Sequence, residues 1–225
     1  MWTAVVEARE GQTPAAMQAL EQLARAYWRP LYVFLRQRGR DHENASEEVQ
    51  GFFAHLLGRD FLRFVQPREG RFRTFLLASF TRWLDDQRDR ANAAKRGGGQ
   101  TLIPLQEFDS LSGMMPSEQG APEEAFDRRW AREVFDTALA RLEEAWAERR
   151  ELFLALRASL TSGGEAEEYA TIGARLGMNE GAVKKAAFDL RAKFARIIRE
   201  EVRRTVRDDA AVDEELRYLI KLLRQ

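Results

Sequence analysis

The sequence predicts an all-α protein, with two helical domains joined by a linker and a further helix at the C-terminal end. Apolar residues recur at intervals of three and four along nearly the whole chain, which is the spacing of a buried helix face. No stretch shows the alternation of apolar and polar residues that is typical of a half-buried strand. Between residues 95 and 121 the periodicity gives way to Gly, Ser, Pro and Gln. We therefore expect a helical bundle over 13–94, a flexible linker over 95–121, a second helical domain over 122–206 and an amphipathic helix in the extension 207–225.

The first domain opens with two expected helices that carry boundary signals. Pro14 occupies a first helical position, Pro30 should restart or kink the helix, and Gly39 should end it. Asn44 and Glu47 have the spacing of a capping box, with Asn in place of the usual Ser or Thr. The second helix is therefore expected to begin at Asn44.

A long amphipathic helix is expected after the loop VQPREGR (65–71). Its apolar face is rich in aromatic residues: Phe72, Phe75, Leu76, Phe80, Trp83 and Leu84. We expect Phe72 in the hydrophobic core because it is in phase with that face. In the second domain, helix resumes at Pro122, and the turn at Gly163-Gly164 precedes the last pair of helices.

Residues 167–199, EEYATIGARLGMNEGAVKKAAFDLRAKFARIIR, have the pattern of a helix-turn-helix. The turn is expected at Gly177, and Asn179 can cap the second helix. That helix carries Lys184 and Lys185 in its first exposed turns and is suited to the major groove of DNA. An ordinary helical hairpin within a bundle is the alternative. The apolar positions that support both interpretations are Tyr169, Ile172, Leu176, Ala182, Val183, Ala186, Leu190 and Phe194.

The charges balance overall but are unevenly distributed. Lys and Arg number 36, as do Asp and Glu, so the net charge is zero and a uniformly basic nucleic-acid coat protein is excluded. Any DNA contact must come from local basic zones. Residues 59–99 hold ten Lys and Arg against five acids, and residues 184–204 hold eight against three. A solvated helix face accounts for part of this pattern.

The sequence offers no catalytic or metal-binding constellation, so we expect neither an enzyme nor a cofactor. The only histidines, His42 and His55, do not have a metal-ligand spacing, and there is no cysteine. RGGGQ (96–100) lacks the Lys-Ser/Thr of a phosphate-binding loop. Asp85 and Asp86 are adjacent and point about 100° apart on a helix, so they form no facing acid–base pair.

No apolar run approaches the roughly 20 residues of a membrane span, and MWTAVVEARE contains acids and no long apolar stretch. The sequence therefore predicts a soluble, intracellular protein.

Over about residues 14–205 the chain resembles an RNA polymerase sigma factor of the extracytoplasmic-function (ECF) class. NASEEVQGFFAHLL (44–57) is similar to the family's acidic helix DAEDxxQxxF, matching at Ala45, Glu47, Gln50 and Phe53, with Asn44 and Ser46 in place of acids. GRFRTFLLASFTRWLDDQRDR resembles WLxxIxxNxxxDxxR, with Phe75 in the Trp position, Leu76 kept, Arg82 in the Asn position and Asp86 kept. YATIGARLGMNEGAVKK is similar to YxEIAxxLGxxxGTVKS, with Ala182 for Thr and Lys185 for Ser. YWRPLY, GRFRTFLL, KRGGG and FDRRWA also resemble a subgroup with long linkers and a C-terminal extension.

The resemblance implies a non-enzymatic subunit of the bacterial cytoplasm that directs core RNA polymerase to promoters and helps to melt them. The first domain would correspond to sigma region 2 and the second to sigma region 4. The implied partners are promoter DNA and core polymerase, through its β′ clamp helices and β flap. The polymerase-binding residues would be Glu47, Glu48, Gln50 and Phe53 on the acidic helix. Whether an anti-sigma factor or other regulator binds is left open.

The same resemblance places two sets of DNA contacts. The loop PREGRFR (67–73) would hold a base flipped from the −10 element, with phosphate contacts from the cationic residues of this zone: Arg68, Arg71, Arg73, Arg82 and Arg88. The second helix of the helix-turn-helix would read the −35 element through Asn179, Glu180, Lys184, Lys185 and Arg191. Phe188-Asp189 departs from the subgroup, where a polar-basic pair is more usual.

Two alternatives remain beside the sigma factor. One is a helix-turn-helix regulator that binds DNA without polymerase, and the other is a helical adaptor that does not bind DNA. For the extension, we expect the helix at 212–224 to dock on the rest of the chain through Leu216, Leu219, Ile220 and Leu223.

Overall fold

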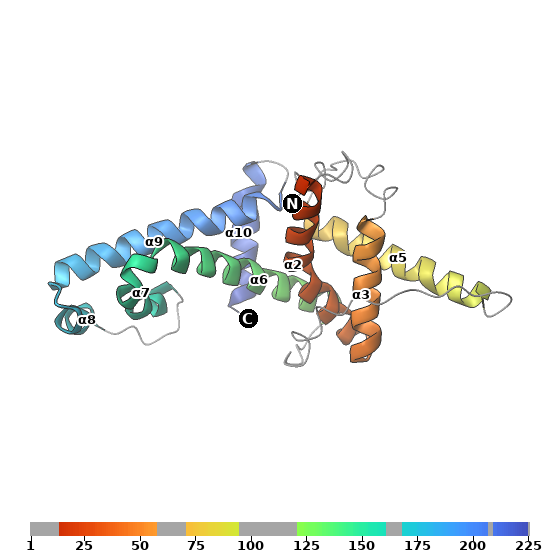
Figure 1. The fold of residues 1–225 in the computed structure, drawn as a ribbon, viewed down its shortest axis with the longest axis horizontal. Helices are drawn as coiled ribbons and strands as arrows, with labels where there is room; N and C mark the ends of the chain where they lie inside the picture. The colour runs from red at the N-terminus through yellow and green to blue at the C-terminus, as the bar shows by residue number, and fades with distance from the viewer. Residues whose placement is uncertain (1–13, 58–70, 95–120, 161–167, 207–208, 225) are drawn as a thin grey trace. The chain divides into compact units, whose positions relative to one another are not determined.

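The computed structural model describes residues 14–57, 71–94, 121–160, 168–206 and 209–224, and within these ranges the protein is all-α, as predicted (Figure 1). Residues 58–70 and all of the predicted linker 95–121 except residue 121 lie outside the described residues. The helices are α2 (Pro14–Gln37), α3 (His42–Leu57), α5 (Phe72–Ala94), α6 (Pro122–Ala145), α7 (Arg150–Leu156), α8 (Tyr169–Leu176), α9 (Glu180–Arg203) and α10 (Ala210–Leu223). Short 3-10 turns cover Ala147–Arg149 and Arg157–Leu160.

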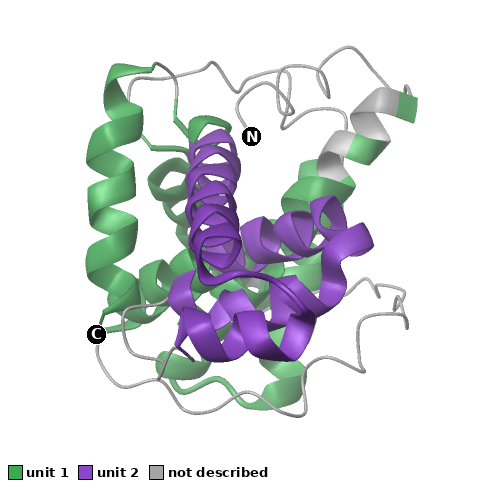
Figure 2. Cartoon of the chain, turned by 90° about the vertical axis from the view of Figure 1, so that its left-hand side faces the viewer, with its two compact units in different colours: residues 1–132, 203–225 green, residues 133–202 purple. Residues whose placement is uncertain are grey.

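The chain divides into two units whose boundaries differ from the predicted ones (Figure 2). Unit 1 contains residues 1–132 and 203–225, and unit 2 contains residues 133–202. The first turns of α6 belong to unit 1 because Phe126 and Trp130 are buried there, and the Trp130 ring lies against the guanidinium of Arg73. The predicted boundaries at 122 and 206 rest on changes in amino-acid composition. Composition does not show that Phe126 and Trp130 are buried in unit 1.

Helix α2 begins at Pro14, as the sequence predicts, but it is not interrupted at Pro30. Proline removes one backbone hydrogen bond from a helix interior. Here the neighbouring side chains of Tyr27, Leu31 and Phe34 are all buried, so packing on both sides of Pro30 holds the helix together. The chain turns at Gly39, where φ is +80°, and this confirms the predicted helix end.

Helix α3 begins at His42, so the predicted start at Asn44 is wrong. The capping residue is Asp41, whose Oδ1 accepts the backbone N–H of Asn44 at 2.8 Å. The Asn44 side chain donates to Oδ2 of the same carboxylate at 2.6 Å. These hydrogen bonds hold the pKa of Asp41 below its ordinary value, and the bond from the backbone N–H has the larger effect. Asn44 thus supplies donors to the cap and is not the cap.

An aromatic cluster forms the core of unit 1 between α2, α3 and α5. The rings of Phe52 and Phe80 lie 4.9 Å apart, and Tyr27 meets Phe72 edge-on at 5.4 Å. Phe72 is 1% exposed, which confirms its predicted place in the core. Aromatic pairs of this kind contribute about 0.5–1.5 kcal/mol beyond the area they bury, so α5 is fixed firmly at its first turn.

Helix α10 belongs to unit 1, and the face that it buries overlaps the predicted one only in part, because Leu219 is buried and Leu216 and Leu223 are half-buried. Its buried residues are Val212, Glu215, Leu219 and Leu222, whereas Ile220 is 46% exposed. The apolar periodicity favoured a stripe centred on Leu219 and Ile220. In the structure, the buried face of α10 is centred nearer to Glu215, because the Glu215 carboxylate pairs with Arg73, a buried arginine of α5.

Unit 2 has its own hydrophobic core, which α9 shares with α6, α7 and α8. The ring of Phe135 meets that of Phe194 edge-on at 5.4 Å. Arg141 of α6 joins α9 by ion pairs with Glu200, at 3.1 Å, and with Glu201. The buried members of the core are Ala138, Leu142, Leu152, Phe153, Leu156, Ile172, Val183, Ala186, Ala187, Leu190 and Ile197.

Candidate nucleic-acid interface

Helices α8 and α9 are joined by a tight turn at Gly177, where the sequence predicts the turn. The φ of Gly177 is +66°, a left-handed conformation that glycine adopts readily. The backbone N–H groups of Gly177 and Met178 both donate to the carbonyl of Gly173, the second at 2.9 Å. The turn thereby provides hydrogen-bond donors for a backbone carbonyl at the end of α8, and it fixes the direction in which the chain enters α9.

The first turn of α9 is capped as the sequence predicts. Asn179 Oδ1 accepts the backbone N–H of Ala182 at 2.8 Å. A cap of this kind typically stabilises a helix by about 1 kcal/mol. Asn179 therefore has a structural role at the start of α9, where it was also predicted to contact DNA.

The buried stripe of α9 sets which side of the helix faces outward. Val183, Ala186, Ala187 and Leu190 are buried in the core of unit 2. Residues on the opposite side of a helix with this stripe must face solvent. The exposed residues in the first three turns are Glu180, Gly181, Lys184, Lys185, Phe188 and Asp189.

Both predicted lysine contacts are exposed but already carry intrahelical partners. Lys184 Nζ lies 2.7 Å from Glu180 Oε1, and Lys185 Nζ lies 3.0 Å from Asp189 Oδ2. The hydrogen bond with Glu180 raises the pKa of Lys184, so this side chain stays charged. Exposed pairs at this spacing stabilise a helix only weakly, because water screens them. Phosphates can therefore compete for both lysines.

Two further residues of α9 differ in their contacts: Arg191 has a hydrogen-bond partner on α8, and Phe188 is largely exposed. The Arg191 guanidinium donates to the hydroxyl oxygen of Tyr169, which ties the middle of α9 to the start of α8. Phe188 is 68% exposed, the highest value among the large apolar side chains that the structure describes. An aromatic ring set beside two lysines gives this face both an apolar and a cationic component.

The predicted polymerase-binding residues on α3 do not all face solvent. Glu47 is exposed and Gln50 is half-buried, while half-buried Glu48 pairs with Arg40 at 3.1 Å. Phe53 is only 9% exposed, and its ring lies 6.0 Å from that of Phe52. The ring packs into the bundle, so the expected contact of Phe53 with a partner stays a prediction.

The arginines predicted to contact the −10 element fall into two groups. Arg82 and Arg88 lie on α5, and both are exposed to solvent. Arg88 lies 3.9 Å from the carboxylate of Asp85. Arg71 and Arg73 are engaged within unit 1, and Arg73 is 3% exposed, so it cannot reach a phosphate in this conformation. Arg68 lies outside the described residues.

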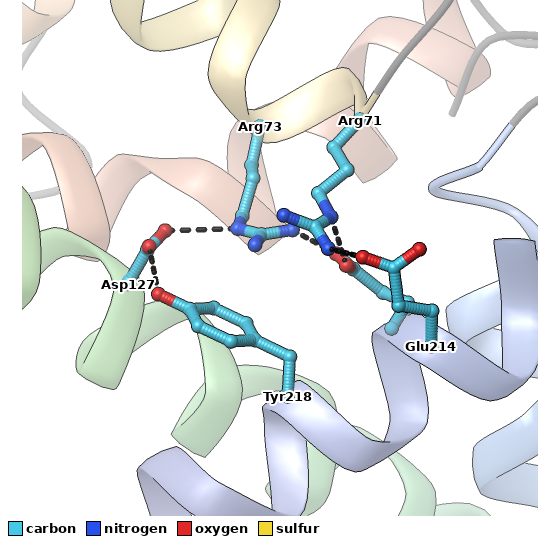
Figure 3. Close-up of polar contacts among 6 residues, drawn as sticks. Arg71, Arg73, Asp127, Glu214 and Tyr218 are labelled. Carbon is cyan, nitrogen blue, oxygen red and sulfur yellow. Dashed lines mark hydrogen bonds and ion pairs between the residues drawn. The ribbon is translucent and has the colours of Figure 1, made fainter.

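Arg71 and Arg73 belong to a polar cluster formed by α5, α6 and α10 (Figure 3). Arg73 Nε lies 2.8 Å from Asp127 Oδ1, and Arg73 also pairs with Glu215. Arg71 lies 2.6 Å from Glu214 and 2.6 Å from Glu215. We call this group the arginine cluster; its members are Arg71, Arg73, Asp127, Glu214, Glu215 and Tyr218.

The arginine cluster is well packed as well as charged. The Arg73 guanidinium carbon lies 4.6 Å from the Trp130 ring centre and 4.7 Å from that of Tyr218. The Tyr218 hydroxyl donates to Asp127 at 2.6 Å. Burial and this hydrogen bond raise the pKa of Tyr218, so it stays a neutral donor. Removing one partner of such a buried pair typically destabilises a protein by about 3–5 kcal/mol.

No protein family, curated protein or solved structure matches the chain. Within the described residues, no group of three or more His, Asp or Glu side chains is placed to hold a metal ion. None of the helices searched in those same residues is long and apolar enough to cross a membrane. The site must therefore be interpreted from its own geometry.

The sequence interpretation missed Glu215, Asp127 and Gly173. A Glu in the apolar stripe of 212–223 was the available signal for a buried pair, because an acid on a buried face needs a cation. Its partner could not be identified, since the pair joins residues 142 positions apart. Gly173 carried no signal beyond its place before the turn.

Proposed function

We propose that this chain is a sigma factor of the ECF class, which binds bacterial core RNA polymerase and directs it to promoters. In this proposal, α9 reads the −35 element while unit 1 binds the polymerase and the −10 element and helps to melt the DNA. The observation that carries the proposal is the helix-turn-helix, in which α9 is capped, set by Gly177 and exposes Lys184 and Lys185. This is the form in which a helix enters the major groove.

Unit 1 supports the second part of the proposal. Glu47 is exposed on α3 and suits a basic partner surface, while Arg82 and Arg88 are accessible on α5. Such an arrangement allows one helix to face a protein partner while another faces DNA. The bacterial cytoplasm, where core polymerase acts, would be the location of the protein.

In vitro transcription with bacterial core enzyme and a promoter library tests the proposal. We expect initiation that depends on this protein, with start sites that share two upstream elements. Lys184→Ala with Lys185→Ala should reduce it, and Glu47→Lys should weaken co-purification with β′. Glu123→Gln, an exposed change on α6, is the control. A protein that neither binds core enzyme nor supports any initiation would end the proposal.

The burial of Phe53 favours a second candidate, a helix-turn-helix regulator that acts without polymerase. This burial removes the apolar anchor expected for a polymerase contact on α3. Such a regulator would bind DNA tightly as an isolated protein, usually as a dimer on a palindrome. A sigma factor should bind promoter DNA weakly until core enzyme is present. A helical adaptor would show no salt-dependent affinity for DNA at all.

A further inference from the structure

The Glu215 carboxylate bridges two arginines in the way a phosphate would. Its Oε2 lies 2.6 Å from Arg71 Nε, and its Oε1 pairs with Arg73. Glu214 adds a second carboxylate to Arg71 at 2.6 Å. Two guanidinium groups converging on one small anion are the usual means of binding phosphate, because each offers a planar fork of donors.

We propose that Arg71 and Arg73 form a binding site for the phosphate backbone of a nucleic acid, and that α10 occupies it in the free chain. Glu214 and Glu215 then stand in for phosphate groups, and nucleic acid binds unit 1 only when α10 leaves. This inference rests on the proposed function, in which this part of unit 1 faces promoter DNA.

The charge of the cluster changes sign when α10 leaves. With α10 in place, Arg71 and Arg73 face three carboxylates, those of Asp127, Glu214 and Glu215. Without α10, the two arginines face Asp127 alone among these. The closed cluster therefore repels a phosphate, and the open cluster attracts it.

Arg73 keeps its orientation when α10 leaves because α6 holds it as well. Asp127 pairs with its Nε, and the Trp130 ring lies against its guanidinium. Both residues belong to unit 1 and lie outside α10. The open site is therefore preformed on this side.

The outer edge of the cluster gives a competing phosphate a place to start. The side chain of Glu214 is 68% exposed and that of Arg71 is 34% exposed, whereas Arg73 and Glu215 are buried. A nucleic acid can meet Arg71 first, replace Glu214 and then displace Glu215. Exposed pairs of this kind are weakened by salt and exchange readily with water.

Fluorescence anisotropy with a 20-nucleotide single-stranded DNA tests the proposal on the full-length protein. We expect Glu214→Gln to bind severalfold tighter than wild type, and Glu214→Gln with Glu215→Gln to bind at least tenfold tighter. Every additional phosphate that the protein neutralises should steepen the log–log salt slope by about 0.7. Adding Arg71→Gln to Glu214→Gln should abolish the tighter binding. Glu123→Gln, which makes the same charge change at an exposed site of α6, should bind as wild type does.

Because the double variant removes a buried partner, the exposed Glu214→Gln change keeps the test valid if that variant does not fold. Hydrogen exchange supplies a second readout: DNA binding should raise amide exchange in 210–223. The proposal is overturned if Glu214→Gln and Glu123→Gln bind alike, or if α10 stays fully protected in the DNA complex.

Failure of the sigma-factor proposal gives a different result. If α10 leaves and the chain binds DNA but never supports initiation with core enzyme, the arginine site is supported and the sigma-factor function is refuted. If the chain supports initiation while α10 stays in place, the sigma-factor function is supported and the proposed displacement of α10 is refuted.

Discussion

The backbone carbonyl oxygen of Met178 lies 2.5 Å from the point where a β-carbon on Gly173 would stand. Helix α8 and the turn that follows it approach each other so closely that position 173 accommodates no side chain. The backbone N–H of Met178 also donates to the carbonyl of Gly173 at 2.9 Å, so the two backbones are held together at this point. Gly173 is therefore a determinant of the helix-turn-helix, in addition to Gly177.

Replacing Gly173 with Ala should destabilise unit 2. Alanine is favoured over glycine in a helix by about 1 kcal/mol, but insertion of a methyl group into a filled space costs about 1–3 kcal/mol. We expect a net loss of roughly 1 kcal/mol, the middle of the resulting range of about 0–2 kcal/mol, measured by urea unfolding followed by circular dichroism. Gly181→Ala is the control, since its β-carbon would meet Asn179 at an ordinary 3.4 Å. Equal or higher stability of Gly173→Ala would contradict the geometry.

Lys184 and Lys185 should control the salt dependence of DNA binding. Each contact with a duplex phosphate contributes about 0.9 to the slope of log K against log salt. Lys184→Ala with Lys185→Ala should therefore lower the slope by up to about 1.8, measured by anisotropy with duplex promoter DNA and core enzyme present. Lys221→Ala, an exposed change on α10, should leave the slope unchanged. An unaltered slope in the double variant would place the DNA contact elsewhere.

Phe188 should contribute to sequence preference if α9 enters the major groove. Phenylalanine can contact the methyl group of thymine, which deoxyuridine lacks while keeping the same hydrogen bonds. We expect deoxyuridine in the −35 element to weaken binding of the wild type and to have no effect on Phe188→Ala. Stability should not fall, because the ring is largely exposed. If Phe188→Ala remains as sensitive to deoxyuridine as wild type, Phe188 does not contact the thymine methyl.

The cap at Asp41 should make the stability of unit 1 depend on pH in a defined window. Its pKa in the folded protein is lowered, so the charged cap stabilises above the ordinary Asp pKa of about 3.9 and this contribution disappears as the pH falls through the folded value. Asp41→Asn keeps a capping side chain without the charge. Thermal unfolding should therefore show wild type above Asp41→Asn at pH 6, with the difference lost at lower pH. A difference that stays constant between pH 6 and pH 3 would exclude the charge as its origin.

Helix boundaries were predictable from sequence where a single residue type imposes a backbone conformation. Pro14 and Pro122 begin helices, and Gly39 and Gly177 end them with positive φ. These signals are local, so no knowledge of the tertiary fold is needed. The cap of α3 was missed because Asp41 and Asn44 are both good cap residues, and only the geometry decides between them.

The packing of α10 and the state of Arg73 could not be predicted in the same way. Periodicity places apolar residues inward and charged residues outward, and Arg73 was expected at the surface as a phosphate contact. Their burial depends on pairing with residues far along the chain, which for Arg73 are Asp127 and Glu215. A single sequence does not identify the partner in such a pair, because the two residues lie 142 positions apart.

The distance along the chain between Arg73 and Glu215 has a consequence for synthesis. Chains emerge from the ribosome N-terminus first, and α10 is the last described helix to appear. Until then the nascent protein carries Arg71 and Arg73 without their α10 carboxylates, beside ribosomal RNA and other polyanions. Any chain that stops before residue 214 retains this state permanently, so premature termination yields a product in which Arg71 and Arg73 have neither of their α10 carboxylates.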